Sequence, residues 1–346
     1  MNSFLLDGPP GRTAKVSGKE YLFFSGYDYL GIQQDENFTE LLREGLDKYG
    51  LLFPSSRISN TRLALFETFE NRLSVLTGSE ATVSFSSGFS AGRAAVSLFS
   101  KVAAAPGTHP AIQDKNPPAI SFESWQNGLQ QSVFGQTGSG ASVLAADSID
   151  IFQPAIRDFS FLKSLPGKLT VLIDDSHGIG LIGEQGSGIA GLVPRKDSIG
   201  YLFSYSLSKA YGIPGGAVST SRAMAEKLRQ TREYTAATAI SPAVMYAFLQ
   251  GEALYSRQRE KLRQNGLYFR KLISGIPEIS HHPDLPVFVL TGKDCSSRLE
   301  QENILLSAFA YPDPSGKKIQ RIVLNAQHTA EDLETLSEHL HKLFDR

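Results

Sequence analysis

The segment Ser206-Leu-Ser-Lys209-Ala-Tyr-Gly212-Ile-Pro-Gly-Gly216 follows a short apolar run, Tyr201–Tyr205, that is typical of a buried strand. A lysine at the end of a buried strand, between hydroxyl groups and glycines, loses hydration. This lowers its pKa and favours the neutral, nucleophilic amine. A lone loop lysine is far more often a solvated surface residue. The prediction that Lys209 is a nucleophile therefore depends on its neighbours.

A second strand-like run lies upstream and ends in an acidic pair. Thr170–Ile173 is compact and apolar, and Asp174 and Asp175 follow it. Asp174 precedes Lys209 by 35 residues, which leaves room for one crossover and one strand. Since strands that alternate with helical segments form a mostly parallel sheet with helices on both faces, we expect an α/β fold.

The flanking segments extend this alternation. We expect an N-terminal segment over residues 1–39, a large domain over 40–245 and a small α+β domain over 246–346. Residues 101–118, rich in Ala, Pro and Lys, are expected to be a surface loop. The predicted helices are Leu41–Tyr49, Ala64–Leu76, one starting at Ser90, Val244–Leu272 and Ala330–Leu343, and the further strands are Thr82–Phe85, His281–Leu290 and Gln320–Leu324.

Composition excludes several classes of protein. The 35 acidic and 34 basic residues leave a net charge of −1, so no basic surface is expected to bind nucleic acid or an anionic membrane. The single cysteine, Cys295, excludes a disulfide framework and a cysteine-based zinc site, and it favours the cytoplasm. The first residues lack a signal-peptide pattern, and no stretch approaches a membrane span. No metal is expected.

The acidic pair and a nearby histidine suggest a cofactor. A buried carboxylate such as Asp174 can hold the proton on the pyridine nitrogen of pyridoxal 5'-phosphate (PLP). Asp175 points to the opposite face of the strand, because strand side chains alternate. His177 lies where α/β sheets place ligands, at the carboxyl end of the strand. We therefore predict that PLP is carried as a Schiff base on Lys209.

A phosphate also needs a binding turn. The run Ser86-Ser87-Gly88-Phe89-Ser90 offers hydroxyl groups and amides at the start of a predicted helix. By itself this pattern is more often an ordinary helix N-cap. It becomes a candidate phosphate turn only in combination with Lys209 and Asp174.

Two other motifs are rejected. Gly178-Ile-Gly180-Leu-Ile-Gly183 matches the dinucleotide fingerprint, but Asp-Asp-Ser-His separates it from the strand and no helix opens after it. Asp175, Ser176 and His177 contain the residue types of a hydrolase triad. Sequential neighbours cannot form one, however, and the chain has no G-x-S-x-G elbow.

Short segments along the sequence resemble those of the α-oxoamine synthases, PLP enzymes of fold type I that condense an amino acid with an acyl thioester. The resemblance covers nearly the whole chain, and the segments occur in the family's order. They are Gly11-Arg12, Tyr21-Leu22, Asp28-Tyr-Leu-Gly31, Ser56-Arg57, Leu65–Glu70, Ser87-Gly-Phe89, Val171–Gly188, Ser206–Gly216, Thr238–Pro242 and Arg321–Thr329.

The resemblance implies a role for each matching residue. Lys209, Asp174 and His177 would be catalytic, with Asp174 on the ring nitrogen and His177 on the ring oxygen. Phe122 would stack on the ring in place of the family's histidine. The further residues expected to contact the cofactor are Ser87, Gly88, Phe89, Ser148, Ser206 and, from a second subunit, Thr238. Arg12, Tyr27 and Arg321 would bind substrate, and Arg321 would clamp the amino-acid carboxylate through its planar pair of donors.

The sequence departs from the family pattern at positions that the resemblance places near the acyl thioester. Tyr27 stands for an asparagine, and Thr61 and Phe66 stand for a glycine and a histidine. Residues 100–150 are also shortened relative to the family. These departures leave the acyl group and its carrier open.

The expected reaction is decarboxylative condensation of L-alanine with a pimeloyl thioester of CoA or a carrier protein, as in biotin biosynthesis. One alternative is a family member that uses glycine or serine with an acetyl or long-chain acyl thioester. Another is an aminotransferase of fold type I, and a third is a PLP-binding protein without turnover. A homodimer with shared active sites is expected from the resemblance.

Overall fold

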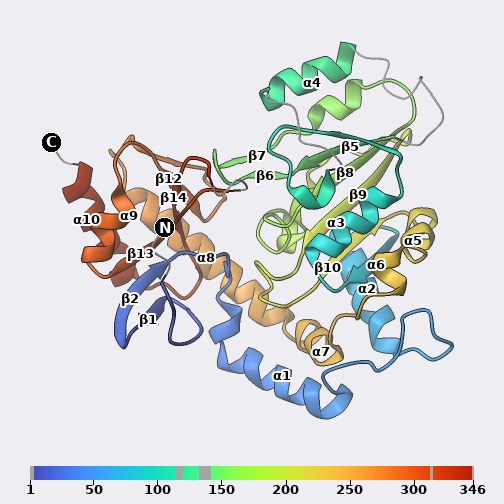
Figure 1. Cartoon of the computed structure of the whole chain (residues 1–346), viewed down its shortest axis with the longest axis horizontal. Helices are drawn as coiled ribbons and strands as arrows, with labels where there is room; N and C mark the ends of the chain where they lie inside the picture. The colour runs from blue at the N-terminus through green and yellow to red at the C-terminus, as the bar shows by residue number, and fades with distance from the viewer. Residues whose placement is uncertain (1–3, 114–119, 132–141, 312–314, 345–346) are drawn as a thin grey trace.

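A computed structural model describes residues 4–113, 120–131, 142–311 and 315–344. The chain forms two lobes, each built on a six-stranded sheet (Figure 1). The large lobe contains the middle of the sequence. The small lobe combines both ends of the chain.

The sheet of the large lobe is mostly parallel. β9 (Ile199–Ser206), β8 (Leu169–Asp174), β5 (Ser142–Asp147) and β4 (Lys101–Ala104) are parallel neighbours in this order. β10 (Gly216–Thr220) is antiparallel to β9 and to the edge strand β3 (Ala81–Phe85). This arrangement confirms the predicted fold class.

Both faces of this sheet are buried, because successive strand side chains enter different cores. In β5, Val143 and Ala145 face one hydrophobic cluster, whereas Leu144 and Ala146 face the other. One face packs against α3 (Gly88–Ser97), α5 (Arg222–Leu228) and α6 (Arg232–Thr235), and the other against α2 (Ala64–Thr77), α7 (Pro242–Gln250) and α8 (Glu252–Leu272). Burial on both faces explains the continuous apolar runs of the strands.

The small-lobe sheet joins residues that are far apart in the sequence. β2 (Lys19–Phe24) runs parallel to β13 (Ile304–Phe309), and β1 (Thr13–Val16) extends the sheet beyond β2. β14 (Ile319–Val323), β12 (Val287–Leu290) and β11 (Ile279–His281) complete it. We propose that the N-terminal strands belong to the small domain, whose boundaries stay a prediction.

Most predicted elements are present, with shifted ends. α1 (Glu36–Tyr49), α2 and α10 (Ala330–Phe344) cover the predicted helices. The predicted helix Val244–Leu272 is divided at Gly251 into α7 and α8. The expected loop over 101–118 is wrong at its start, since β4 pairs with β5 and α4 (Phe122–Gln131) follows farther along the chain.

Residues 25–35, which connect β2 to α1, are positioned by the close packing of α1. α1 lies against α7, and a Cβ atom on Gly45 would lie only 2.5 Å from the carbonyl oxygen of Ala243. A side chain there would push the helices apart. Gly45 therefore fixes the position of α1 and of the preceding segment, which enters the candidate site.

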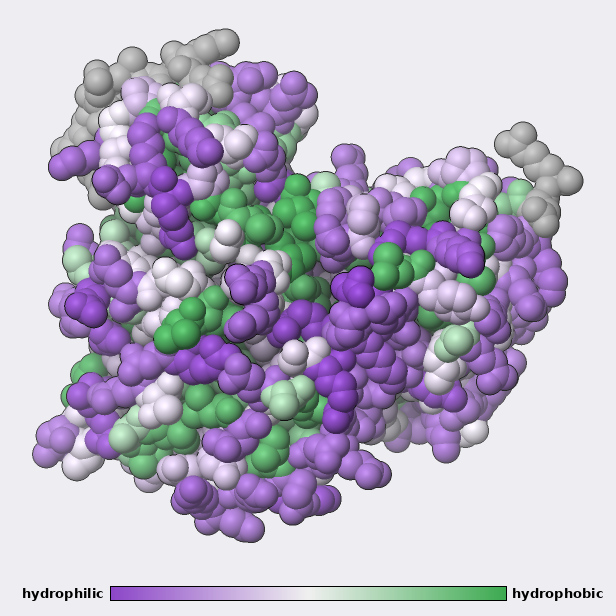
Figure 2. Space-filling model, turned by 180° about the vertical axis from the view of Figure 1, so that it is seen from behind, coloured by the Kyte–Doolittle hydropathy of each residue, from purple (hydrophilic) through white to green (hydrophobic). Residues whose placement is uncertain are grey.

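The surface shows how the lobes meet. Figure 2 shows a notch between them, with apolar surface on its large-lobe side. Among the described residues, none of the helices has the length and apolar character needed to cross a membrane.

Candidate active site

The candidate site lies at the carboxyl ends of β8 and β9. Asp174 is the last residue of β8 and Ser206 the last of β9, and in the parallel register Asp174 is the Cα partner of Ser204. Lys209 follows three residues after β9. Since α/β sheets bind ligands outside the carboxyl ends of their strands, this is the expected edge.

Lys209 lies in an environment that favours its neutral amine. Burial lowers the pKa of Lys209, and the nearby carboxylates of Asp174 and Asp147 oppose this shift. Asp174 is 7% exposed and accepts a hydrogen bond from the backbone N–H of Ser176 at 3.0 Å. The structure thus brings Lys209 and Asp174 close enough for their charges to interact.

His177 is neutral at physiological pH. Burial lowers the pKa of His177 well below its usual range, and the positive charges of Lys209 and Arg321 lower it further. Its Nδ1 atom lies 2.7 Å from the hydroxyl oxygen of Tyr29. A neutral imidazole can serve as a hydrogen-bond donor or acceptor but carries no charge.

The candidate phosphate turn is built by close backbone approach. α3 begins at Gly88, and Ser87 Oγ accepts the N–H of Ser90 at 3.0 Å. A Cβ atom on Gly88 would lie 2.5 Å from the Cβ atom of Ser206. Only glycine therefore lets the N-terminus of α3 meet the end of β9. N–H groups in the first turn of a helix are available to bind an anion.

Arg321 presents donors that need an acceptor. Its guanidinium carbon lies 5.4 Å from the ring centre of Phe152 and 5.5 Å from that of Phe309. One nitrogen donates to Ser307 Oγ at 3.4 Å, and within the described residues the buried Nε has no partner. A planar guanidinium with free donors fits a carboxylate.

Sequence reasoning missed His109, which follows β4. Its backbone N–H donates to both carboxylate oxygens of Asp147, with N···O distances of 3.1 Å and 3.2 Å. Burial lowers the pKa of His109, while the charge of Asp174 raises it and that of Lys209 lowers it. If Lys101–Ala104 had been predicted as a parallel strand, His109 would have been recognised, because it would then follow the carboxyl end of a strand at the same sheet edge as Asp174.

Asp147 was also missed. It ends β5 and is the Cα partner of Asp174 on the neighbouring parallel strand, so the two carboxyl groups are close. Burial, followed by the negative charge of Asp174, raises the pKa of Asp147 to about 8. Two adjacent carboxylates therefore retain a proton at neutral pH.

Two predicted cofactor contacts, Phe122 and Ser148, lie in surroundings that differ from those expected. Phe122 lies on α4, where its ring packs with those of Trp125, Phe159 and Phe161. His109, in contrast, lies within electrostatic reach of Asp174 and Lys209, so we propose that it replaces Phe122 as the stacking residue.

Ser148 is the second of these two residues. It is fully buried, and its hydroxyl donates to Asp175 at 2.6 Å. Asp175 also accepts the N–H of Ile189 at 2.8 Å. Ser148 therefore supports the loop after β8 through Asp175, and its hydroxyl is already engaged.

The remaining predicted residues lie outside this cluster or on the surface. Arg12 pairs with Asp332 at 3.1 Å within the small lobe. Tyr27 is 51% exposed, and Phe89 and Thr238 are exposed too. The roles of these four residues in binding substrate, cofactor or a second subunit stay predictions.

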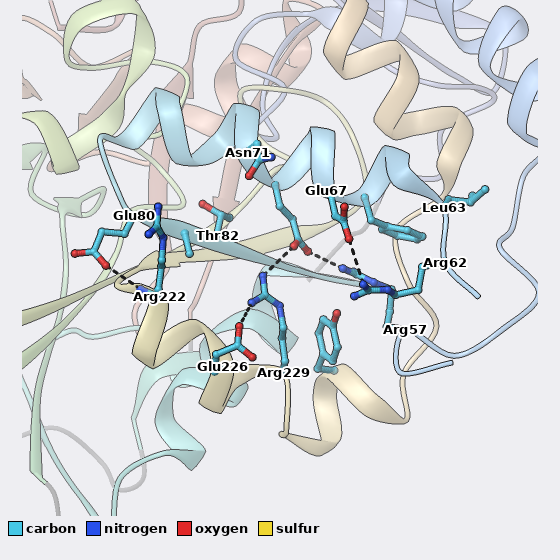
Figure 3. A pocket seen from close by; sticks show the side chains of 14 residues that line it. Arg57, Arg62, Leu63, Glu67, Asn71, Glu80, Thr82, Arg222, Glu226 and Arg229 are labelled. Atoms are coloured by element: carbon cyan, nitrogen blue, oxygen red, sulfur yellow. Dashed lines mark hydrogen bonds and ion pairs between the residues drawn. The ribbon is translucent and has the colours of Figure 1, made fainter. Parts of the chain in front are cut away.

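A separate pocket of 510 Å³ lies between α2, β3, α5 and α6 (Figure 3). Glu70 is its buried centre and accepts hydrogen bonds from Arg57, at 2.8 Å, and from the backbone N–H and hydroxyl of Ser84. Arg229 lies 3.5 Å from the same carboxylate. Because Ser84 belongs to the strand that leads to Ser87, this network fixes the approach to the phosphate turn.

Comparison with known proteins connects these features to a family. The family model described as "Aminotransferase class I and II" matches residues 160–340. The 8-amino-7-oxononanoate synthase of Lysinibacillus sphaericus is 27% identical over 353 residues, which cover 95% of this chain and 90% of that protein.

Two solved structures share the fold. Serine palmitoyltransferase from S. paucimobilis, with bound PLP-myriocin aldimine, has a TM-score of 0.83 at 18% identity and covers 98% of this chain and 92% of its own. The 8-amino-7-oxononanoate synthase of Francisella tularensis has a TM-score of 0.73 at 23% identity, with coverages of 94% and 99%. These similarities confirm fold type I.

The carboxyl pair predicts a pH-dependent stability. Because the pKa of Asp147 is raised in the folded state, the unfolded chain releases this proton first, and stability falls as pH rises from about 4 towards about 8. Asp147→Asn removes the ionisation. Urea unfolding at pH 5, 7 and 9 should show the variant gaining stability relative to wild type as pH rises. A constant difference between the two proteins would contradict the raised pKa.

Proposed function

Because the chain belongs to the class I and II aminotransferase family, we propose that it is a PLP-dependent acyltransferase whose cofactor is held by Lys209. The observation that carries this proposal is the grouping of Lys209, Asp174 and His177 at one sheet edge, next to a helix N-terminus. A lysine amine, a buried carboxylate and an anion-binding turn match the aldehyde, ring nitrogen and phosphate of PLP.

The described residues fit this cofactor in detail. Asp174 has acceptor capacity beyond its bond to Ser176, which suits a protonated ring nitrogen. The turn at Ser87, Gly88 and Phe89, together with Ser206, would hold the phosphate. Gly88 supports this role directly, since its missing side chain allows the helix end to reach Ser206.

When bound, PLP supplies an electron sink for the negative charge that develops at the substrate α-carbon. The chain's own residues direct this chemistry. The amine of the substrate would displace Lys209 from PLP, and the freed Nζ of Lys209 would be the base that takes the α-proton. The lowered pKa of Lys209 suits that task. Arg321 binds the amino-acid carboxylate and so orients the α-carbon. His177 hydrogen-bonds an oxygen in the site.

We further propose that the substrates are an amino acid and an acyl thioester, with L-alanine and a pimeloyl group as first candidates. A bond forms between the α-carbon and the acyl carbon, the thiol leaves, and the carboxyl group departs as CO₂. The 8-amino-7-oxononanoate synthase relatives support this choice. The departures from the family pattern at Tyr27, Thr61 and Phe66 keep other acyl groups as alternatives.

Cofactor attachment is tested by absorbance and mass spectrometry. Purified protein mixed with PLP should develop a visible absorbance band, and borohydride should fix the cofactor on the peptide that contains Lys209. Lys209→Ala should lose the covalent link because no amine is left to form it. Lys163→Ala, at an exposed position, is the control. A colourless wild-type protein would contradict the proposal.

Substrate identity is tested by a mass-resolved product assay. Alanine, serine and glycine are each incubated with pimeloyl, acetyl and palmitoyl thioesters, and free thiol is measured. We expect an amino-ketone, CO₂ and thiol from alanine with the pimeloyl donor. Amino transfer to a 2-oxo acid without thiol release would instead identify an aminotransferase.

We also propose that the protein is a homodimer whose contact surface includes the phosphate turn. Large apolar side chains are exposed at the end of α1, in the loop after it and at the turn: Leu46, Leu51, Leu52, Ile58 and Phe89. Ser56 of this loop donates to the carbonyl oxygen of Thr235 at 3.0 Å, three residues before Thr238. A second copy covering this surface would bring Thr238 near a phosphate site.

Light scattering tests the dimer. Wild type should have twice the chain mass, and Ile58→Asp should shift it towards the monomer because a charge is costly in an apolar interface. Leu267→Asp, on α8, is a matched control at another exposed apolar position. A fully active monomer at low concentration would overturn the shared-site proposal.

A further inference from the structure

The contact between Tyr29 and His177 joins distant parts of the chain. Tyr29 lies between β2 and α1, and His177 lies in the loop after β8. The hydroxyl oxygen of Tyr29 is 2.7 Å from Nδ1 of His177, and the tyrosine is 2% exposed. This is a short hydrogen bond between an almost fully buried side chain and a residue of the candidate site.

The protonation states of Tyr29 and His177 identify the donor of this hydrogen bond. His177 is neutral, so its ring carries one N–H. Burial raises the pKa of Tyr29, so its hydroxyl keeps its proton. Among the described residues, Nδ1 of His177 is the acceptor that this hydroxyl reaches. Since a buried hydroxyl proton requires an acceptor, Tyr29 donates to Nδ1 and the ring proton resides on Nε2.

We propose that Tyr29 is a positioning residue that fixes His177 in the tautomer protonated at Nε2, so that His177 presents a hydrogen-bond donor to an oxygen of the bound substrate or cofactor. The identity of that oxygen rests on the proposed function. The tautomer itself does not. Without Tyr29, either ring nitrogen of His177 can carry the proton, and the donor is present only part of the time.

Backbone hydrogen bonds from the small lobe and within its own turn hold Tyr29 in place. Its carbonyl oxygen accepts the N–H of Ala326 at 2.9 Å, and Ala326 follows β14, the strand that carries Arg321. Next to Tyr29, the backbone carbonyl oxygen of Asp28 accepts the N–H of Gly31 at 3.1 Å, which closes a tight turn around Tyr29. The strand that positions the carboxylate clamp therefore also positions the residue that orients His177.

Imidazole nitrogen NMR tests the tautomer directly. The protein is labelled with ¹⁵N in its seven histidines, and His177→Asn identifies the signals of His177. In wild type we expect a protonated Nε2 and an unprotonated Nδ1, unchanged from pH 6 to pH 9. Tyr29→Phe should give a signal for protonated Nδ1 or a mixture of both tautomers.

Tyr205→Phe is the matched control. Tyr205 is also a buried tyrosine, and its hydroxyl bonds to Ser219 at 2.8 Å, so its variant loses one buried hydrogen bond without touching His177. Its His177 signals should match wild type. A wild-type His177 protonated at Nδ1, or a tautomer unchanged in Tyr29→Phe, overturns the proposal. The wild-type spectrum is decisive by itself if Tyr29→Phe fails to fold.

A kinetic measurement connects the tautomer to turnover. With the PLP-loaded enzyme, Tyr29→Phe should lower kcat by roughly tenfold, because a fixed donor contributes mainly in the transition state. The KM for the amino acid should stay within about twofold, since Arg321 is unchanged. An unchanged kcat overturns the donor role. Absence of turnover in wild type with every thioester contradicts the proposed function but leaves the NMR result valid.

Discussion

The parallel pairing of β8 with β9 brings the candidate carboxylate, histidine and lysine to one edge of the large sheet. Asp174 ends one strand opposite Ser204 of the other, and Lys209 follows a short turn later. A slip of one residue in this pairing would turn Asp174 to the opposite face of the sheet and would displace the loops that carry His177 and Lys209. Apolar residues on both faces of both strands make such a slip costly, so core packing fixes the geometry of the site.

The strand order also places several ionisable groups close together in a buried site. β5 lies beside β8 and adds Asp147 next to Asp174, while Lys209, Arg321, His109 and His177 converge from other elements. Burial opposes charge on each group, so His177 is neutral, Lys209 tends towards its neutral form and Asp147 holds a proton. These are the protonation states that proton transfer near neutral pH requires.

The small lobe completes the site from outside the sheet. Arg321 comes from β14, and Tyr29 comes from the segment that links β2 to α1. Both depend on a sheet in which β2 pairs with β13, far away in the sequence. Residues of both lobes thus contribute to the site, so relative movement of the lobes would change the position of Arg321 and the hydrogen bond of His177 together.

The sequence by itself determined the fold class, and it predicted a site at Lys209, Asp174, His177 and the turn at Gly88, because each belongs to a local strand or turn pattern that carries its own chemical meaning. It did not reveal His109, Asp147 or Tyr29. β4 is short and weakly apolar, and the partners of these residues are set by strand order and by contacts between segments far apart in the sequence. For the same reason the surroundings of Phe122 and Ser148 could not be predicted, since they follow from packing. Local patterns decided which residues end strands, and only tertiary structure decided which of them meet.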